Sequence, residues 1–156
     1  MPILLVRHGH AGSKAAWVGD DARRPLSEHG RDEAVALVGL LGAYAPVRIL
    51  SSPLLRCLQT VEPLAIELGV AVEESALLVP DAGAAALGFV RSLHDQEGAV
   101  VVCTHGEVIQ EVQVAFRDDG VPGVGRQRGR AKASTWVLEL TDGKVTAARY
   151  LRPPLG

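Results

Sequence analysis

The chain has 156 residues, of which 47% are hydrophobic and only 4% aromatic, and its formal net charge is −2. This length predicts one domain, residues 1–156, with a core of aliphatic side chains, and the composition excludes a wholly disordered chain. The charge gives no electrostatic reason to expect nucleic acid or an anionic membrane as a partner, and no apolar run reaches the length of a transmembrane helix.

The first predicted element is a short buried strand. Residues 3–10, ILLVRHGH, join four aliphatic residues to an arginine, two histidines and a glycine. Four apolar residues are too few for a secretory signal, and they are typical of a strand inside a parallel sheet. Because open α/β sheets bind ligands at the carboxyl ends of their strands, Arg7 and His8 are predicted to contact a ligand.

A polar loop and a helix follow this strand. Residues 11–26 are rich in Gly, Asp, Arg and Pro and predict an ordered surface loop. Ser27 is a candidate N-cap, and apolar residues at helical spacing predict a helix over residues 28–43. Pro46 ends that stretch, and residues 47–52, VRILSS, predict a second buried strand.

The second helix is predicted from its two ends. Ser52 is a candidate N-cap, with Pro53 at the first helical position, and Gly69 is expected to end the helix after Leu68. Pro63 is expected to bend or divide this helix, because proline lacks the N–H that the helix interior uses.

The remaining elements complete an alternation of strands and helices. The expected order is a strand at residues 70–74, a loop at 77–83, a helix at 84–94, a strand at 99–105, a helix at 108–116, a mobile Arg- and Gly-rich loop at 118–132, and a hairpin of strands 134–140 and 144–151. This alternation predicts an α/β fold: a three-layer sandwich with a mostly parallel central sheet flanked by helices and the C-terminal hairpin at its edge.

Polar side chains that apolar packing does not explain follow three of the predicted strands. They are Arg7-His8-Gly9, Ser51-Ser52-Pro53 with Arg56, and Thr104-His105-Gly106. The carboxyl ends of parallel strands share one edge of a sheet, so two arginines and two histidines are expected to converge beside helix N-termini, which favour an anion. Guanidinium groups match phosphate oxygens in a bidentate geometry. The sequence therefore predicts a phosphoryl group as the ligand.

The two cysteines favour a reducing compartment and do not indicate cysteine chemistry. Cys57 and Cys103 form no C-x-x-C pair, which argues against a zinc ribbon or a redox motif and favours a cytoplasmic protein. A cysteine-based phosphatase loop would place an arginine six residues after the cysteine, but Pro63 and Ile109 occupy those positions.

The chain resembles the histidine phosphatase superfamily, also called the phosphoglycerate mutase-like family, in three segments: LLVRHGHA, SSPLLRCLQT and VVVCTHGEVI. These segments stand in the family's order and extend over most of the chain. The short length, the segment RRPLSEHGRDEA and the terminal hairpin are most similar to SixA-type phosphohistidine phosphatases and to the phosphatase domains fused to some Nudix hydrolases. The larger mutases carry insertions between these motifs that this chain lacks.

The resemblance implies a role for each matching residue. His8 would be the nucleophile that forms a phosphohistidine, and it would have to be neutral, with a backbone carbonyl fixing its tautomer. The phosphoryl oxygens would be held by Arg7, Arg56, His105 and Gly106 as charge develops in the transition state. No metal or other cofactor is expected, because the arginines supply the positive charge.

The proton donor for the leaving group is expected after the third strand, where family members often use a glutamate. This chain offers Asp81 there, which is the candidate general acid. A leaving imidazole needs less protonation than an alkoxide, so the absence of that glutamate favours phosphohistidine over a sugar phosphate as substrate. Glu107 is expected to stabilise a helix N-terminus as a first-turn carboxylate.

Other interpretations stay open beside these. Candidate rim residues are His10, Ser13 and Trp17, the last together with Asp20 and Asp21, although Trp17 could equally pin the loop to the core. Arg126, Arg128 and Arg130 could bind a second phosphate or an acidic protein face, or be solvated. The predicted function is a metal-independent phosphatase acting on a phosphohistidine protein or a small phosphate ester. The alternatives are a phosphoglycerate-type mutase and a non-catalytic phosphate-binding module.

Overall fold

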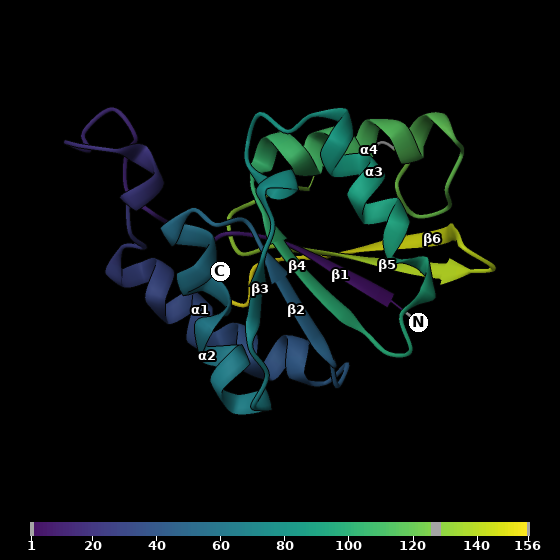
Figure 1. Cartoon of the computed structure of the whole chain (residues 1–156), viewed down its shortest axis with the longest axis horizontal. Helices are drawn as coiled ribbons and strands as arrows, with labels where there is room; N and C mark the ends of the chain where they lie inside the picture. Colours follow the sequence, from purple (N-terminus) through teal and green to yellow (C-terminus); the bar gives the residue numbers. More distant parts are fainter. Residues whose placement is uncertain (1, 126–128, 156) are drawn as a thin grey trace.

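A six-stranded sheet lies between two layers of helices in the computed structural model, which describes residues 2–125 and 129–155 (Figure 1). The strands are β1 (Pro2–Arg7), β2 (Arg48–Ser51), β3 (Val72–Glu74), β4 (Val100–Thr104), β5 (Thr135–Thr141) and β6 (Lys144–Leu151). Their order is β3-β2-β4-β1-β5-β6. The first four pair in parallel, whereas β5 pairs antiparallel with both β1 and β6. The predicted sandwich with a hairpin at its edge is confirmed.

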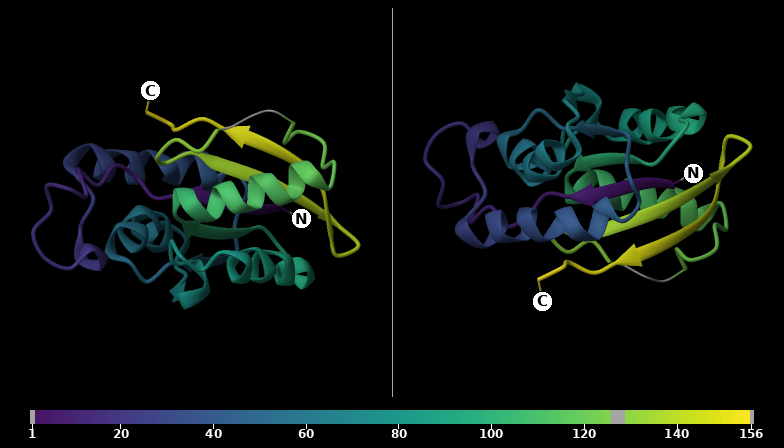
Figure 2. Two further views of the ribbon diagram at one scale, coloured as in Figure 1. Left: turned by 90° about the horizontal axis from the view of Figure 1, so that it is seen from above. Right: turned by 90° about the horizontal axis from the view of Figure 1, so that it is seen from below.

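The helices cover the sheet in two pairs. They are α1 (Glu28–Gly42), α2 (Leu55–Leu68), α3 (Ala84–Arg91) and α4 (Gly106–Asp118), and short 3₁₀ turns stand at Asp21–Arg23, Ala76–Leu78 and Ser92–Asp95. One apolar cluster joins α1 and α2 to one face of the sheet, and a second joins α3 and α4 to the other face. Figure 2 shows the resulting layers from above and below. Among the described residues, none of the helices is both long and apolar enough to cross a membrane.

The local signals behind α1 and α2 explain where these helices begin and end. Ser27 caps α1 as predicted, because its side-chain oxygen accepts a hydrogen bond from the Gly30 backbone N–H. Gly69 ends α2 in the left-handed conformation, with φ of 67°, where a residue without Cβ is favoured. Strand β1 is buried on both faces, which accounts for its unbroken aliphatic run.

The predicted start of α2 is wrong, and one of the two effects predicted for Pro63 does not occur. The helix begins at Leu55, and its N-cap, Leu54, offers no side-chain cap; the Ser52 hydroxyl accepts only a 3.3 Å hydrogen bond from the Leu54 N–H. Pro63 does not divide the helix, which continues to Leu68. Residues Val61, Leu64 and Ala65 on either side of it are buried against the sheet and α1, so tertiary packing offsets the lost backbone hydrogen bond.

The other boundaries differ from the predictions by a few residues. Helix α4 begins at Gly106, immediately after β4, and α3 gives way after Arg91 to a 3₁₀ turn. The loop predicted to be mobile over residues 118–132 is packed in its first part: Val121 and Val124 are buried, and Pro122 accepts a hydrogen bond from the Ala148 N–H. Arg126 and Arg128 lie outside the described residues.

Candidate active site

Three strand ends are held together at the carboxyl edge of the parallel strands. The His8 N–H donates to the Thr104 carbonyl at 3.1 Å, and the Ser52 N–H donates to the Cys103 carbonyl at 3.0 Å. These bonds extend the sheet's hydrogen bonding past the strands themselves. As a result, the residues that follow β1, β2 and β4 emerge side by side, which is the arrangement that the three motifs predicted.

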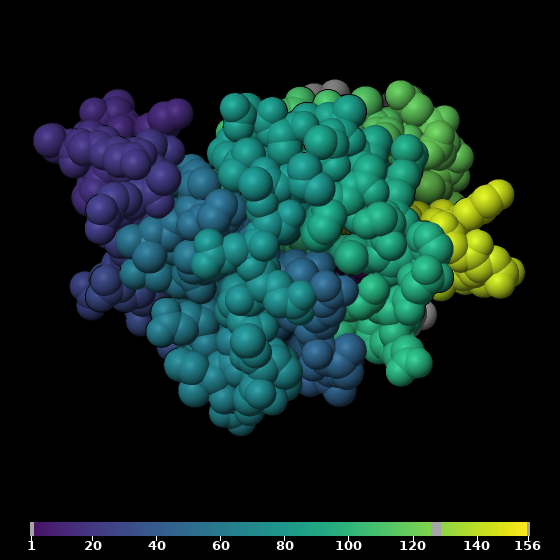
Figure 3. All heavy atoms as spheres, in the orientation of Figure 1, coloured from purple at the N-terminus to yellow at the C-terminus, as the bar shows by residue number. Residues whose placement is uncertain are grey.

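The side chains from these strand ends line one cavity of about 220 Å³. It is bounded on its outer side by the loop at residues 11–26, which forms the purple projection of Figure 3, set apart by a notch from the neighbouring teal surface. The lining residues are Arg7, His8, Gly12, Lys14, Asp21, Arg24, Arg56, Pro80, His105, Glu107 and Lys132. The structure therefore brings together all four residues predicted to contact the phosphoryl group through side chains.

His8 is a neutral imidazole with one ring nitrogen free. Its Nδ1 lies 2.8 Å from the Gly9 carbonyl oxygen, so Nδ1 carries the proton and donates it, and Nε2 is left with its lone pair. The side chain is only 5% exposed, and this burial, reinforced by the nearby positive charges of Arg56 and Arg7, lowers the pKa of His8 to about 3. The Gly9 N–H in turn donates to Thr60 Oγ1 at 2.9 Å, which fixes the peptide bond before Gly9.

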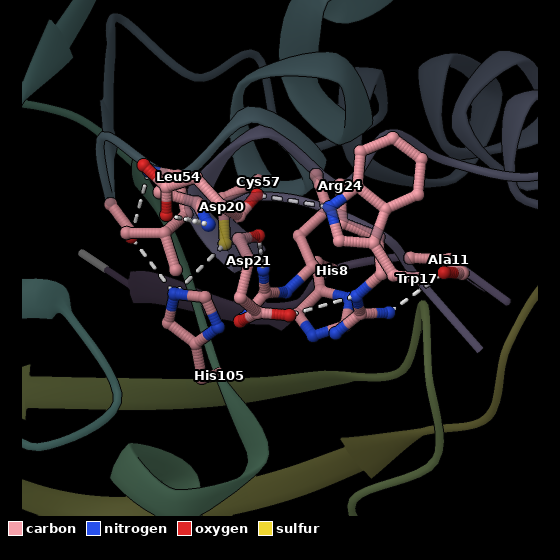
Figure 4. A network of polar contacts seen from close by, with 12 residues as sticks. His8, Ala11, Trp17, Asp20, Asp21, Arg24, Leu54, Cys57 and His105 are labelled. Atoms are coloured by element: carbon pink, nitrogen blue, oxygen red, sulfur yellow. Dashed lines mark hydrogen bonds and ion pairs between the residues drawn. The ribbon is translucent and has the colours of Figure 1, made fainter. Parts of the chain in front are cut away.

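His105 faces His8 edge to face, with ring centroids 5.3 Å apart. Its Nε2 lies 2.8 Å from Ser52 Oγ and 3.5 Å from Cys57 Sγ. A dashed line in Figure 4 marks the contact between His105 and Cys57. Since Ser52 Oγ accepts from the Leu54 N–H, its own proton is available for Nε2, and this leaves the proton of a neutral His105 on Nδ1. Burial, followed by the charge of His8, lowers the pKa of His105 to about 2.

Buried donors without a partner gather at this cavity. Among the described residues, five buried side-chain atoms make no hydrogen bond, and three of them are Arg7 Nε, Arg56 Nε and His105 Nδ1. Each can donate, and a buried donor left unsatisfied costs stability. An oxyanion bound among them would supply the missing acceptors. Within the same described residues, no group of three or more His, Cys, Asp or Glu side chains is arranged to hold a metal ion.

Asp21 places a carboxylate against two of the arginines. Its Oδ1 accepts from Arg24 Nε at 3.0 Å, and its Oδ2 lies 3.2 Å from Arg56 Nη2 (Figure 4). Desolvation opposes ionisation of this carboxyl, but the hydrogen bond from Arg24 and the charge of Arg56 hold its pKa below the ordinary value. Asp21 is therefore an ionised partner of the arginines in this state.

The other candidate residues lie outside the cavity lining. Asp81 is exposed, and its neighbour Pro80 lines the cavity in its place. Ser13 and Trp17 line a separate hollow of about 270 Å³ on the same loop, and the Trp17 indole donates to the Asp20 carbonyl. The His10 ring points to Ser27, with Nδ1 2.7 Å from its hydroxyl oxygen.

Gly106 belongs to the site through its lack of a side chain. A Cβ at this position would lie 2.9 Å from the Arg7 guanidinium carbon. The glycine at the start of α4 therefore makes room for Arg7, whose Nη1 donates to the Arg130 carbonyl at 2.7 Å. This is a packing reason for glycine at a position that the resemblance implied would contact phosphate.

Sequence reasoning did not select several charged residues that line the cavity. It did not place Lys14, Arg24, Glu107 and Lys132 in the cavity lining. It also did not identify Asp21 as a partner of the arginines. The three-residue spacing of Asp21, the first residue of a 3₁₀ turn, and Arg24, its C-cap, was the available signal. Lys132 carried no such signal, because it reaches the site from the segment before β5, far from any motif.

Comparison with known proteins places these features in one family. The family model for the histidine phosphatase superfamily (branch 1) matches residues 3–79. An 8-oxo-(d)GTP phosphatase of Mycolicibacterium smegmatis is 38% identical over an alignment of 156 positions that covers 97% of this chain and 48% of the relative. The chain thus spans about half the length of the curated relative that it matches.

Solved structures share the fold at lower identity. The protein histidine phosphatase SixA in complex with tungstate is 21% identical, with a TM-score of 0.76 over 99% of this chain and 97% of that one. A mycobacterial glucosyl-3-phosphoglycerate phosphatase in complex with VO₃ is 21% identical, with a TM-score of 0.74 over 96% of each chain. YhfR of Bacillus stearothermophilus is 21% identical, with a TM-score of 0.77 over 94% of each chain.

Proposed function

Because the chain belongs to the histidine phosphatase superfamily, we propose that it is a phosphatase in which His8 takes the phosphoryl group from the substrate. The observation that carries this proposal is the neutral His8 ring, whose Nδ1 is bound to a carbonyl and whose Nε2 is free in a cavity with unsatisfied donors. This is the state that a nitrogen nucleophile needs.

The reaction would proceed in two displacements. His8 Nε2 attacks phosphorus, an N–P bond forms, and the bond from phosphorus to the leaving group breaks, with its electron pair going to the leaving group. Arg7, Arg56 and the Nδ1–H of His105 would hold the phosphoryl oxygens as their charge is redistributed. Water then attacks the phosphohistidine, the electron pair of the N–P bond returns to Nε2, and inorganic phosphate leaves. The two arginines supply the positive charge, so we propose that this chemistry proceeds without a metal ion.

The positions of the carboxyl groups around the cavity indicate which kinds of substrate the site could accept. Asp21 is engaged by Arg24 and Arg56, and Asp81 is not in the cavity lining, so neither is placed in this state to protonate a leaving group. Glu107, the other carboxylate of the lining, lies near Arg7 and acts on its charge. Substrates whose leaving group needs little protonation fit such a site. We therefore propose a phosphohistidine protein as the first candidate, ahead of a small phosphate ester. The two free, buried cysteines are compatible with a reducing compartment, and we propose the cytoplasm.

A second candidate substrate is a nucleotide phosphoanhydride. A phosphate leaving group also needs little protonation, and the side chains of two lysines of the cavity lining, Lys14 and Lys132, make no ion pair or hydrogen bond among the described residues. They are available for a second phosphate of the substrate. The 38% identical relative named as an 8-oxo-(d)GTP phosphatase also favours this candidate.

Hydrolysis of p-nitrophenyl phosphate in the presence of EDTA tests the proposed activity. The wild-type protein should turn over, His8→Ala should abolish turnover, and His29→Ala, which removes an exposed histidine of α1, should retain it. Rapid acid-free quenching with ³²P-labelled substrate should trap label on the wild-type protein but not on His8→Ala. Turnover by His8→Ala at the wild-type rate would overturn the proposal.

A panel of substrates separates the alternatives. Release of inorganic phosphate from a phosphohistidine peptide, a sugar phosphate and a nucleoside diphosphate should rank the candidates, and a loss confined to the diphosphate in Lys14→Ala and Lys132→Ala would select the nucleotide. Transfer of phosphate to a second hydroxyl instead of water would indicate a mutase. Binding of phosphate without any turnover would indicate a non-catalytic module.

A further inference from the structure

The turn that follows β1 is held by one face of α1. The Ser27 N–H donates to the His10 carbonyl at 2.9 Å, and the Ser27 hydroxyl donates to the same oxygen at 3.1 Å. Gly30 lies so close that a Cβ there would be 2.0 Å from this oxygen. One helical turn further, Glu33 Oε1 accepts from the His10 N–H at 2.8 Å. Ser27, Gly30 and Glu33 are three residues apart in sequence and therefore share a face of the helix.

Glu33 and His8 are connected through a single peptide group. The Gly9 carbonyl accepts the proton of His8 Nδ1, and the N–H of that same peptide group, which belongs to His10, donates to Glu33. A hydrogen bond at one end of an amide polarises it and strengthens the hydrogen bond at the other end. A carboxylate at the N–H end thus makes the carbonyl a better acceptor for the imidazole.

The burial of Glu33 needs an explanation beyond packing. The residue is only 3% exposed, although it sits on a helix whose neighbouring Asp32 is exposed. Its other oxygen has an exposed histidine, His29, at 3.8 Å. Burying a carboxylate is costly unless it is hydrogen bonded, and the main-chain N–H of His10 is the short bond that it makes. The segment RRPLSEHGRDEA therefore places the buried carboxylate of Glu33 one peptide group away from the proposed nucleophile, His8.

We propose that Glu33 is a positioning residue for His8, acting through the peptide group between Gly9 and His10. By holding this peptide group, Glu33 keeps the Gly9 carbonyl directed at Nδ1, which confines the proton to Nδ1 and leaves the lone pair of Nε2 directed at the phosphoryl group. This inference rests on the proposed function of His8. In serine proteases a carboxylate bonded directly to histidine fixes the tautomer; here one amide stands between the two groups.

A purely structural role for Glu33, as an anchor between α1 and the turn, predicts a different outcome. An anchor would affect stability and leave the state of the His8 ring unchanged. A positioning role changes the tautomer and the rate of phosphoryl transfer, and leaves the binding of the phosphate group to the arginines intact. The two roles are therefore separated by measurements on the ring itself and by the division of an effect between kcat and KM.

Three variants test the proposal. Glu33→Met keeps the volume and removes the acceptor, Glu33→Gln keeps an acceptor without the charge, and Asp32→Met is the matched control at an exposed neighbouring carboxyl. We expect Glu33→Met to lower kcat for p-nitrophenyl phosphate about 100-fold with KM almost unchanged, because the nucleophile is misplaced. Glu33→Gln should lose about tenfold or less, since a neutral hydrogen bond replaces a charged one. Asp32→Met should match the wild type.

Nitrogen-15 NMR of the His8 ring reads the tautomer without any need for activity, so it distinguishes failure of this proposal from failure of the proposed phosphatase function. The wild type and Glu33→Gln should show Nδ1 protonated and Nε2 unprotonated, whereas Glu33→Met should show a mixture. A single Nδ1–H tautomer in folded Glu33→Met, or an unchanged kcat in an active protein, would overturn the proposal. If Glu33→Met does not fold, spectra of the wild-type protein test the proposal instead. A protonated Nε2 of His8 in the wild type would overturn the proposal. So would a His10 amide proton that lacks the downfield shift of a charge-assisted hydrogen bond.

Discussion

Acid should destabilise this protein through the two histidines of the cavity. Burial holds the pKa of His8 near 3 and that of His105 near 2, well below the ordinary value of 6.5. Between these values the unfolded chain binds protons that the native histidines do not bind. Stability is therefore fully present above about pH 6.5 and is lost as the pH falls toward the native pKa values.

The size of the loss follows from these pKa values. Integrating the linkage relation from pH 7 to pH 4 gives about 3 kcal/mol for His8, with its native pKa of about 3. His105 gives about 3 kcal/mol over the same interval, since its native pKa is lower still. Domains are stable by only about 5–15 kcal/mol, so the two histidines together remove a large part of the free energy of unfolding.

Urea unfolding at pH 7, 5.5 and 4 measures this loss, in buffers without phosphate, because a bound anion would add stability of its own. Between pH 7 and 4, His8→Gln should lose about 3 kcal/mol less than the wild type, because glutamine does not titrate. His29→Gln, at an exposed histidine of α1, should follow the wild type. Equal losses in His8→Gln and the wild type would refute the assignment of a buried, neutral His8.

Four further substitutions have defined outcomes. Arg56→Ala should lower kcat for p-nitrophenyl phosphate by about 10²–10³-fold, because it removes a preorganised donor, and a smaller effect in initial rates would mean that Arg56 does not contact the phosphoryl group. Asp21→Asn should tighten inorganic phosphate binding about fivefold in calorimetry, because the carboxylate competes for Arg56, and weaker binding would contradict this. Gly30→Ala should cost about 1–3 kcal/mol, since its Cβ would lie 2.0 Å from a backbone oxygen. Gly39→Ala in the same helix, where the added Cβ would meet no described atom within 4 Å apart from the nearby backbone of the helix itself, should stabilise by about 0.5–1 kcal/mol. The reverse order of stability in thermal unfolding would count against the contact at Gly30.

The fold was predictable because local sequence patterns indicate most of its strands and the cap of α1. Residues 3–6 of β1 and residues 100–103 of β4 are all apolar, which is what burial on both faces requires, and the cap at Ser27 has the oxygen that the Gly30 N–H needs. The convergence of Arg7, His8 and His105 follows from the parallel pairing of β1 and β4, once each is known to end in polar residues. Topology therefore predicts which main elements of the site meet.

Contacts between a loop and a helix, or between side chains far apart in the sequence, could not be predicted from local patterns. In the sequence Ser52 resembles an N-cap, but α2 begins later, and the Ser52 hydroxyl oxygen lies 2.8 Å from His105 Nε2, which only the packing of β2 beside β4 reveals. Asp21 meets Arg56 across 35 residues, and its spacing to Arg24 predicts only a local ion pair. Glu33 looks like a solvent-facing helix carboxylate until the turn after β1 is placed against α1.

The proposed affinity of this cavity for an anion would arise from the placement of charged groups rather than from the net charge of the chain. The whole chain carries a formal charge of −2, yet the cavity lining contains five lysine and arginine side chains against two carboxylates. Arg7 and Arg56 are anchored at their outer nitrogens, by the Arg130 carbonyl and by Asp21, so each Nε is left buried without a partner. The backbone that fixes these groups is itself held by β1, β4 and α2, which are buried for reasons unrelated to ligand binding. The unsatisfied donors therefore persist in the folded chain, and an oxyanion bound as proposed would gain hydrogen bonds there without the protein having to reorganise.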